Sequence, residues 1–118
     1  MKVKLSQIIN SVPAFKVITP QATNAKSAFR LAKMLNKIQY ELDAFETAKN
    51  NITNNYQETT EDGKKQIPES KIEIFKKEII ELLEEEIELD CEPLNVTDLT
   101  GINITISNMM LMEFLFKE

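Results

Sequence analysis

The sequence lacks the side chains on which most enzymatic chemistry depends. It contains no histidine, the commonest general base and metal ligand in proteins. Its one cysteine, Cys91, has neither a histidine to activate it nor a second cysteine with which to share a zinc ion. The two glycines, Gly63 and Gly101, stand alone, so there is no glycine-rich loop to hold phosphates. We therefore expect a protein that is not an enzyme, uses no cofactor or metal ion, and works by binding.

Four cations in the N-terminal third form the first candidate binding site. They recur at steps of four, three and four residues, which places them along one side of a helix. The chain's only arginine is among them, and its planar guanidinium could hold a phosphate through two hydrogen bonds. An ordinary solvated face, or a charge match to the protein's own acidic half, fits the same pattern. The candidate anion- or partner-binding residues are Lys26, Arg30, Lys33 and Lys37.

Charge is distributed unevenly along the chain. Residues 1–37 hold seven cations and no acid, whereas residues 38–118 hold the other seven cations and all 19 acids, which leaves −12 in that part. The net charge of −5 disfavours direct binding to duplex nucleic acid, and no DNA-reading motif is visible. The acidic run between residues 81 and 90 lacks the spacing and the glycine of a calcium loop, and it indicates a solvated surface.

The second candidate site is the C-terminal stretch 109–116, in which only Glu113 is not apolar. A helix of this kind is normally buried all round, which a monomer of this size rarely achieves for its last helix. The stretch is therefore either core or an interface with another subunit or partner, a role that suits methionine and aromatic side chains. We expect a homo-oligomer. The candidate interface residues are Met109, Met110, Met112, Phe114 and Phe116.

Helices must position both candidate sites. Between about residues 24 and 55, apolar residues alternate steps of three and four, which predicts one long central helix with a coiled-coil-like seam. A second helix is predicted over 70–85, and a last one runs from Thr105 or Ser107 to about Phe116. The seam of the long helix consists of Ala28, Leu31, Leu35, Ile38, Leu42 and Phe45.

A few short strands should accompany these helices, so the expected fold class is mainly α with a small β component. Residues 2–5 and 87–89 alternate polar and apolar side chains, as strands do. An Asp-Gly turn predicts a hairpin between about residues 56 and 67. Residues 94–96 are predicted to form a further strand beside residues 2–5. Pro13 is expected to interrupt a first helix, because proline cannot donate to the helical hydrogen-bond ladder.

Length and composition describe an ordinary globular chain. At 118 residues with 42% apolar residues, it is predicted to be a single domain over 1–118. One unpaired cysteine points to a reducing compartment. No signal peptide and no stretch of about 20 apolar residues is visible, so no membrane association is expected.

Several short motifs follow one another in a characteristic order. They are Met1-Lys2-Val3-Lys4-Leu5-Ser6, Pro13-Ala14, Ser27-Ala28-Phe29-Arg30-Leu31-Ala32-Lys33, Tyr40-Glu41-Leu42-Asp43-Ala44-Phe45-Glu46, Pro68, Phe75, Glu78, Leu82-Leu83, Glu88-Leu89 and Asp98-Leu99. In this order the chain resembles a family of small phage and prophage proteins of unknown function. The resemblance implies a phage-encoded protein that acts in the host cytoplasm. It supplies no activity, cofactor or catalytic residue.

Such an origin leaves three binding roles open. The first is an anti-defence factor that sequesters a host immune component or a nucleotide signal as a small oligomer. The second is a structural role in virion assembly or as a tail accessory protein, and the third is a regulator that binds a host protein or nucleic acid. The basic stripe and the apolar C-terminus fit the first role, which we adopt as the hypothesis, with a host protein or a small anion as the partner.

Overall fold

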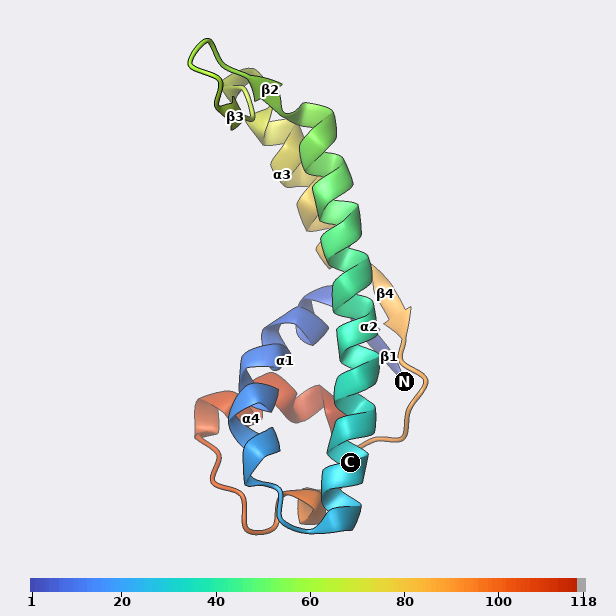
Figure 1. Ribbon diagram of the computed structural model, residues 1–118. Coiled ribbons are helices and arrows are strands. Elements are labelled where there is room, and N and C mark those ends of the chain that lie inside the picture. Colours follow the sequence, from blue (N-terminus) through green and yellow to red (C-terminus); the bar gives the residue numbers. More distant parts are fainter. Residues whose placement is uncertain (117–118) are drawn as a thin grey trace.

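The computed structural model describes residues 1–116 as a helical base from which a two-helix arm projects (Figure 1). Its extents of 56 × 28 × 23 Å and its radius of gyration of 17.8 Å are those of an elongated molecule. A compact chain of this length would have a radius of gyration of about 13–14 Å. The four α-helices are α1 (Leu5–Ile18), α2 (Ala25–Tyr56), α3 (Glu69–Leu83) and α4 (Ile106–Met112).

Short strands and 3₁₀ turns complete the mainly α fold. They form two separate two-stranded antiparallel sheets, one at the neck of the arm and one at its tip. The strands are β1 (Lys2–Lys4), β2 (Glu58–Thr59), β3 (Lys65–Gln66) and β4 (Glu86–Glu88), and the 3₁₀ turns are η1 (Thr19–Gln21), η2 (Val96–Leu99) and η3 (Glu113–Leu115).

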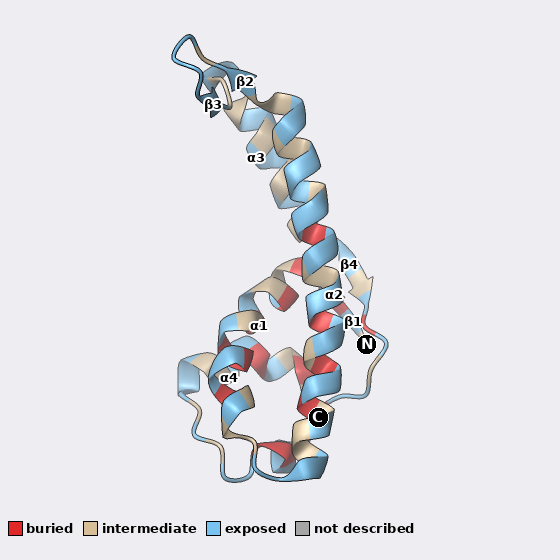
Figure 2. Ribbon diagram, viewed as in Figure 1, coloured by how far each residue is buried: buried red, intermediate tan, exposed pale blue. Residues whose placement is uncertain are grey.

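The long helix α2 confirms the predicted central helix and belongs to both parts of the molecule. The Asn24 side chain starts it by accepting hydrogen bonds from the backbone N–H groups of Lys26 and Ser27, at 2.9 and 3.2 Å. Its first half faces the base, where Leu31 and Ile38 are fully buried. Beyond Phe45 no residue of α2 is buried, because only the arm surrounds it (Figure 2).

The hydrophobic core lies between α1, the first half of α2 and α4 (Figure 2). These three elements bury their apolar stripes against one another, which is the dominant stabilising contribution in a small helical protein. The fully buried side chains include Ile8, Phe15, Ile18, Leu31, Ile38, Leu94, Met112 and Leu115.

The arm consists of the second half of α2, the predicted hairpin and α3. The β2–β3 hairpin turns at Gly63, whose φ of +83° lies in the left-handed region that favours glycine. An edge-to-face contact between Tyr56 and Phe75, with ring centroids 6.4 Å apart, joins the two helices near the tip. Lys71 pairs with Glu58 at 2.8 Å. The helix α3 begins at Glu69, slightly earlier than predicted.

The neck of the arm is fastened by the sheet of β1 and β4, which confirms both predicted strands. The register places Lys2 opposite Glu88 and Lys4 opposite Glu86, so opposite charges face each other across the sheet. The N-terminal ammonium lies 3.0 Å from Glu88, and Lys4 Nζ lies 2.7 Å from Glu84. These contacts join the start of the chain to the end of α3.

Two sequence predictions were wrong. Pro13 does not interrupt α1, because its ring lies on the exposed side while Ile8, Phe15 and Ile18 anchor the helix on both sides of it. Residues 94–96 do not form a strand beside β1, since β4 occupies that position. Leu94 instead makes an isolated bridge to Phe116 and is buried in the core.

The predicted last helix is shorter than expected and ends in a 3₁₀ turn. Thr105, one of the two predicted caps, accepts a hydrogen bond from the N–H of Asn108 at 3.1 Å. The helix α4 then ends at Met112 and continues as η3. Only one side of this segment faces the core.

The two neighbouring positions Met110 and Met112 allow the packing to be tested. Met112 is 0% exposed and Met110 is 68% exposed. We expect Met112→Ala to lower the free energy of unfolding by about 2–4 kcal/mol, because it leaves a cavity, and Met110→Ala to change it by less than about 0.5 kcal/mol. Urea denaturation followed by circular dichroism measures both. Equal effects of the two substitutions would contradict this placement of α4.

Candidate functional site

The predicted basic stripe borders a cavity in the base. Arg30, Lys33 and Lys37 line one wall of this cavity, whose volume is about 470 Å³. The opposite wall is the segment 90–95, which connects β4 to η2. Lys26 lies one turn earlier on α2 and does not reach the cavity. The structure therefore brings three of the four predicted cations together.

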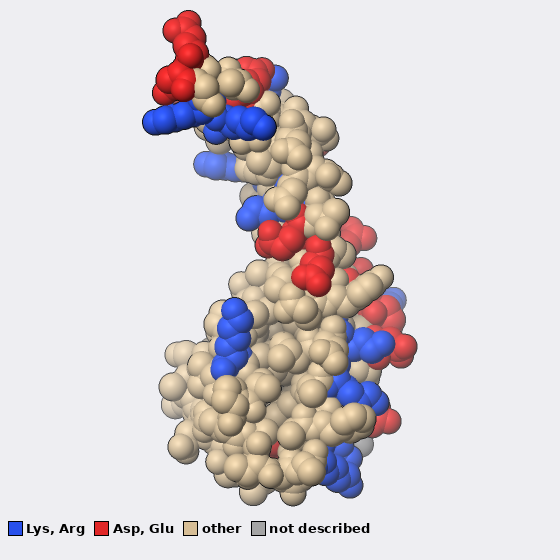
Figure 3. Space-filling model, viewed as in Figure 1, with Lys and Arg blue, Asp and Glu red and all other residues tan. Residues whose placement is uncertain are grey.

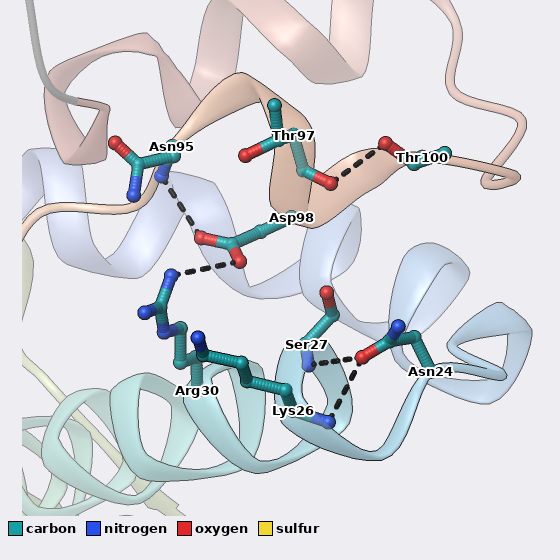
Figure 4. A network of polar contacts seen from close by, with 8 residues as sticks. All are labelled: Asn24, Lys26, Ser27, Arg30, Asn95, Thr97, Asp98 and Thr100. Atoms are coloured by element: carbon teal, nitrogen blue, oxygen red, sulfur yellow. Dashed lines mark hydrogen bonds and ion pairs between the residues drawn. The ribbon is translucent and has the colours of Figure 1, made fainter.

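Arg30 is engaged within the protein (Figure 4). Its guanidinium lies 3.3 Å from Oδ1 of Asp98, whose side chain is buried. The other carboxylate oxygen of Asp98 accepts a hydrogen bond from the N–H of Asn95 at 2.9 Å and so starts the turn η2. Asp98 thus ties η2 to α2, and the Arg30 side chain is part of this link.

The charges around the cavity nearly cancel. The cations of Arg30, Lys33 and Lys37 on one wall face Asp90 and Glu92 on the other, with Asp98 behind Arg30. An anion entering the cavity would meet two carboxylates and would have to compete with Asp98 for the arginine. Since like charges at close range are repulsive, this geometry does not favour a phosphate inside the cavity.

Two exposed aromatic residues on the same side of α2 were not singled out from the sequence. Phe29 is 65% exposed and Tyr40 is 74% exposed. They are eleven residues apart, which on a helix corresponds to about 20° around the axis and about 16 Å along it. Lys33 lies between them, with Nζ 5.5 Å from the centroid of the Phe29 ring. The spacing of eleven is the sequence signal that could have revealed this pair.

Cys91 lies on the cavity wall as a half-buried thiol. Its Sγ is 3.2 Å from Sδ of Met34, and burial raises the pKa of the thiol above its ordinary value. The neutral thiol is therefore the resting form, which is a poor nucleophile.

The predicted C-terminal interface divides into core and surface. Met112 is part of the core, so it is not available to a partner. Met109 is half-buried against the core. Met110, Phe114 and Phe116 line a groove of about 590 Å³ between α1 and α4. The sequence could not separate these roles, because Met110 and Met112 differ only in which side of a short helix they occupy.

Neither a metal site nor a membrane span is found in the part of the chain that the structure describes. Within residues 1–116, no three histidine, cysteine or carboxylate side chains are grouped so that they could hold a metal ion. No helix among these residues is both long and apolar enough to cross a membrane.

Comparison of the chain with protein-family models, with curated protein sequences and with solved structures gives no match.

The structural role of Arg30 can be separated from a ligand-binding role. We expect Asp98→Ala and Arg30→Met to lower the free energy of unfolding by about 1–2 kcal/mol, because each breaks the link between η2 and α2. Lys33→Met, on the same wall but outside the link, should change it by less than about 0.5 kcal/mol. Urea denaturation of the three variants measures this. An unchanged stability of Arg30→Met would show that the arginine is free for a ligand.

The thiol of Cys91 gives a second test. Because its pKa is raised and its sulfur is half-buried, we expect iodoacetamide to alkylate Cys91 more slowly than N-acetylcysteine at pH 8. The rate should keep rising above the pH at which a free thiol levels off, since the thiolate forms later. Unfolding in urea should remove the difference. Mass spectrometry follows the reaction, and an alkylation rate above that of the free thiol would contradict the assigned environment.

Proposed function

We propose that this protein is a non-catalytic binding protein that associates through its arm and captures another protein on its base. The main observation behind the proposal is the exposure of the helix α3. This helix of 15 residues contains seven apolar side chains and buries none of them fully (Figure 2). Most helices of a monomeric protein bury an apolar stripe, so α3 is a helix that lacks part of its packing surface.

The apolar residues of α3 are half-buried along one flank, except for Ile74 and Ile80, which are exposed. Ile72, Ile79 and Leu83 are separated by steps of seven and four residues, which aligns them along the helix. Ile80, which is 59% exposed, extends the same flank outward. The opposite flank is more polar, although Ile74 lies there and is 54% exposed. An apolar stripe with heptad-like steps is the surface that another helix covers.

A second copy of the chain is the occupant that fits this flank best. Two arms of two helices each can form a four-helix bundle, the smallest arrangement in which such helices enclose a core. Closed dimers with two-fold symmetry are also the commonest protein assemblies. In addition, the part of α2 that runs beside α3 near the tip is mostly uncharged, with asparagine and threonine side chains at Asn50, Asn51, Thr53, Asn54 and Asn55. Two copies can therefore approach there without strong repulsion between like charges (Figure 3).

A protein fits the base better as the captured partner than a nucleotide does. The cavity beside the basic stripe holds nearly balanced charges, and its arginine is bound to Asp98. By contrast, the exposed side of α2 and the groove lined by Met110 and Phe114 present aromatic and apolar side chains together with polar groups. This mixture is typical of protein–protein interfaces.

For a phage-encoded protein, the proposed role is anti-defence capture of a host immune component. The elongated shape also suits the alternative role in virion assembly, because a projecting arm can join copies within a larger particle. The roles in capture and in virion assembly can be distinguished by mass spectrometry of purified virions and of proteins that are cross-linked to the chain during infection. Presence in the virion at a fixed copy number would favour assembly, whereas recovery with a host protein alone would favour capture.

Self-association is tested by two substitutions on opposite flanks of α3. We expect Ile80→Glu to convert a dimer to a monomer at high micromolar concentration, because it introduces a charge into the apolar flank. The matched variant Ile74→Glu, equally exposed on the other flank, should remain dimeric. Light scattering coupled to size-exclusion chromatography measures the mass, and circular dichroism checks the helix content.

A strictly monomeric wild-type chain at the same concentration would overturn the role given to the arm. Loss of the dimer in both variants would show instead that the flank is wrongly assigned.

A further inference from the structure

We infer that the exposed side of α2 in the base is a docking face for an acidic amphipathic helix of a partner protein. This inference rests on the proposed function, because it names the chemistry of the captured partner. The face consists of Lys26, Phe29, Lys33, Asn36, Lys37 and Tyr40, and we call it the basic–aromatic face.

The helical repeat places these six residues on one side of α2. With 100° per residue, they fall within about 100° around the axis and extend over about 21 Å along it. Lys26, Phe29, Lys33, Lys37 and Tyr40 are all exposed, and no acidic residue occurs between 26 and 40. The face is therefore a straight ridge that combines positive charge with two large aromatic side chains.

The lysines of this face are not occupied by the protein itself. Within residues 1–116, ion pairs involve the N-terminus, Lys4, Arg30 and Lys71, but none of the three lysines of the face. Lys33 instead lies above the Phe29 ring, with Nζ 5.5 Å from the ring centroid. Charges that are not paired internally are the ones that can attract and orient a partner.

The charged and aromatic side chains of the face indicate which kind of partner would bind there. Carboxylates would pair with the lysines, and apolar side chains would cover Phe29 and Tyr40, which are residues of the kind that dominate binding energy at interfaces. A helix with acidic and apolar residues at steps of three and four carries both on one side. Such a helix of about 14 residues matches the length of the ridge.

Two other occupants fit less well. A second copy placed two-fold on this face would bring lysines against lysines, so self-association should not occur here. A nucleic acid strand carries a negative charge at every nucleotide, so the phosphates that do not fall on the lysines would meet Asp43, Asp90 and Glu92, whereas a helix can place its few carboxylates opposite the lysines. The net charge of −5 also repels a polyanion more strongly than a short helix with a few carboxylates.

The inference is tested with synthetic probes. A fluorescein-labelled peptide of about 14 residues, with glutamate and leucine at steps of three and four on one side, is titrated with the full chain and followed by fluorescence anisotropy. A peptide of the same composition in scrambled order is the control. We expect micromolar binding of the first peptide, at least about tenfold weaker binding of the second, and a loss of affinity at high salt.

Substitutions in the chain test whether the peptide binds to the basic–aromatic face. We expect Phe29→Ala combined with Tyr40→Ala, and separately Lys33→Ala combined with Lys37→Ala, to weaken the peptide by about tenfold or more. Lys16→Ala and Val96→Ala remove an exposed lysine and an exposed apolar residue elsewhere, and they should leave the affinity unchanged. Ile80→Glu in the arm should also bind the peptide like the wild type.

Several results would overturn the inference. These are no binding of the amphipathic peptide, equal binding of the scrambled one, no effect of the face variants, or tighter binding of a labelled eight-nucleotide oligothymidylate. Failure of the proposed function looks different. If the chain is monomeric but binds the peptide, the proposed role of the arm is wrong and the docking face is retained. If the chain is dimeric and variants of the face capture proteins as well as the wild type does, only the present inference is wrong.

Discussion

The structure depends on one helix that is longer than the base it helps to build. At 32 residues, α2 extends about 48 Å, which is well beyond the diameter of a compact domain of this size. Its first half is covered by α1 and by the segment that leads into α4, so the base can close around it. Its second half leaves the base and has only α3 and the hairpin beside it (Figure 1). The arm and its incompletely covered flank are consequences of this length.

The neck shows how the chain holds such an arm in place. The end of α3 leads directly into β4, which pairs with β1 through a ladder of opposite charges. The N-terminus, the base of α3 and the middle of α2 therefore meet at one level. Surface ion pairs contribute little individually, but here they accompany the buried side chains Val3, Leu5 and Leu89. The apolar contacts hold the neck, and the charges set the register of its strands.

The cations of α2 differ in whether the protein itself pairs them. Arg30 is the residue best suited to hold a phosphate, yet it links α2 to η2 through Asp98 (Figure 4). The neighbouring lysines Lys26, Lys33 and Lys37 make no ion pair within residues 1–116. This is why the geometry directs the proposed function away from a bound nucleotide and toward a protein surface, which agrees with the exposed aromatic residues of the same face.

Local signals in the sequence are sufficient to predict the long helix, the hairpin and the two strands of the neck. Each follows from local signals: apolar steps of three and four, an Asp-Gly turn, and alternation of polar and apolar residues. The sequence also determined that the four cations share one side of a helix. Local signals misled at Pro13, because the tertiary contacts of α1 outweigh the loss of one helical hydrogen bond.

Which of the candidate residues are exposed depends on contacts between parts of the chain that are far apart in the sequence. Asp98 and Arg30 are separated by 68 positions in the sequence, and no local pattern encodes their contact. That Met112 is core while Met110 is surface depends on which side of α4 meets α1. Leu31 and Ile38 of the α2 seam are fully buried in the base, whereas Leu42 of the same seam is only half-buried. Burial is set by what surrounds a residue, and distant parts of the chain supply those surroundings.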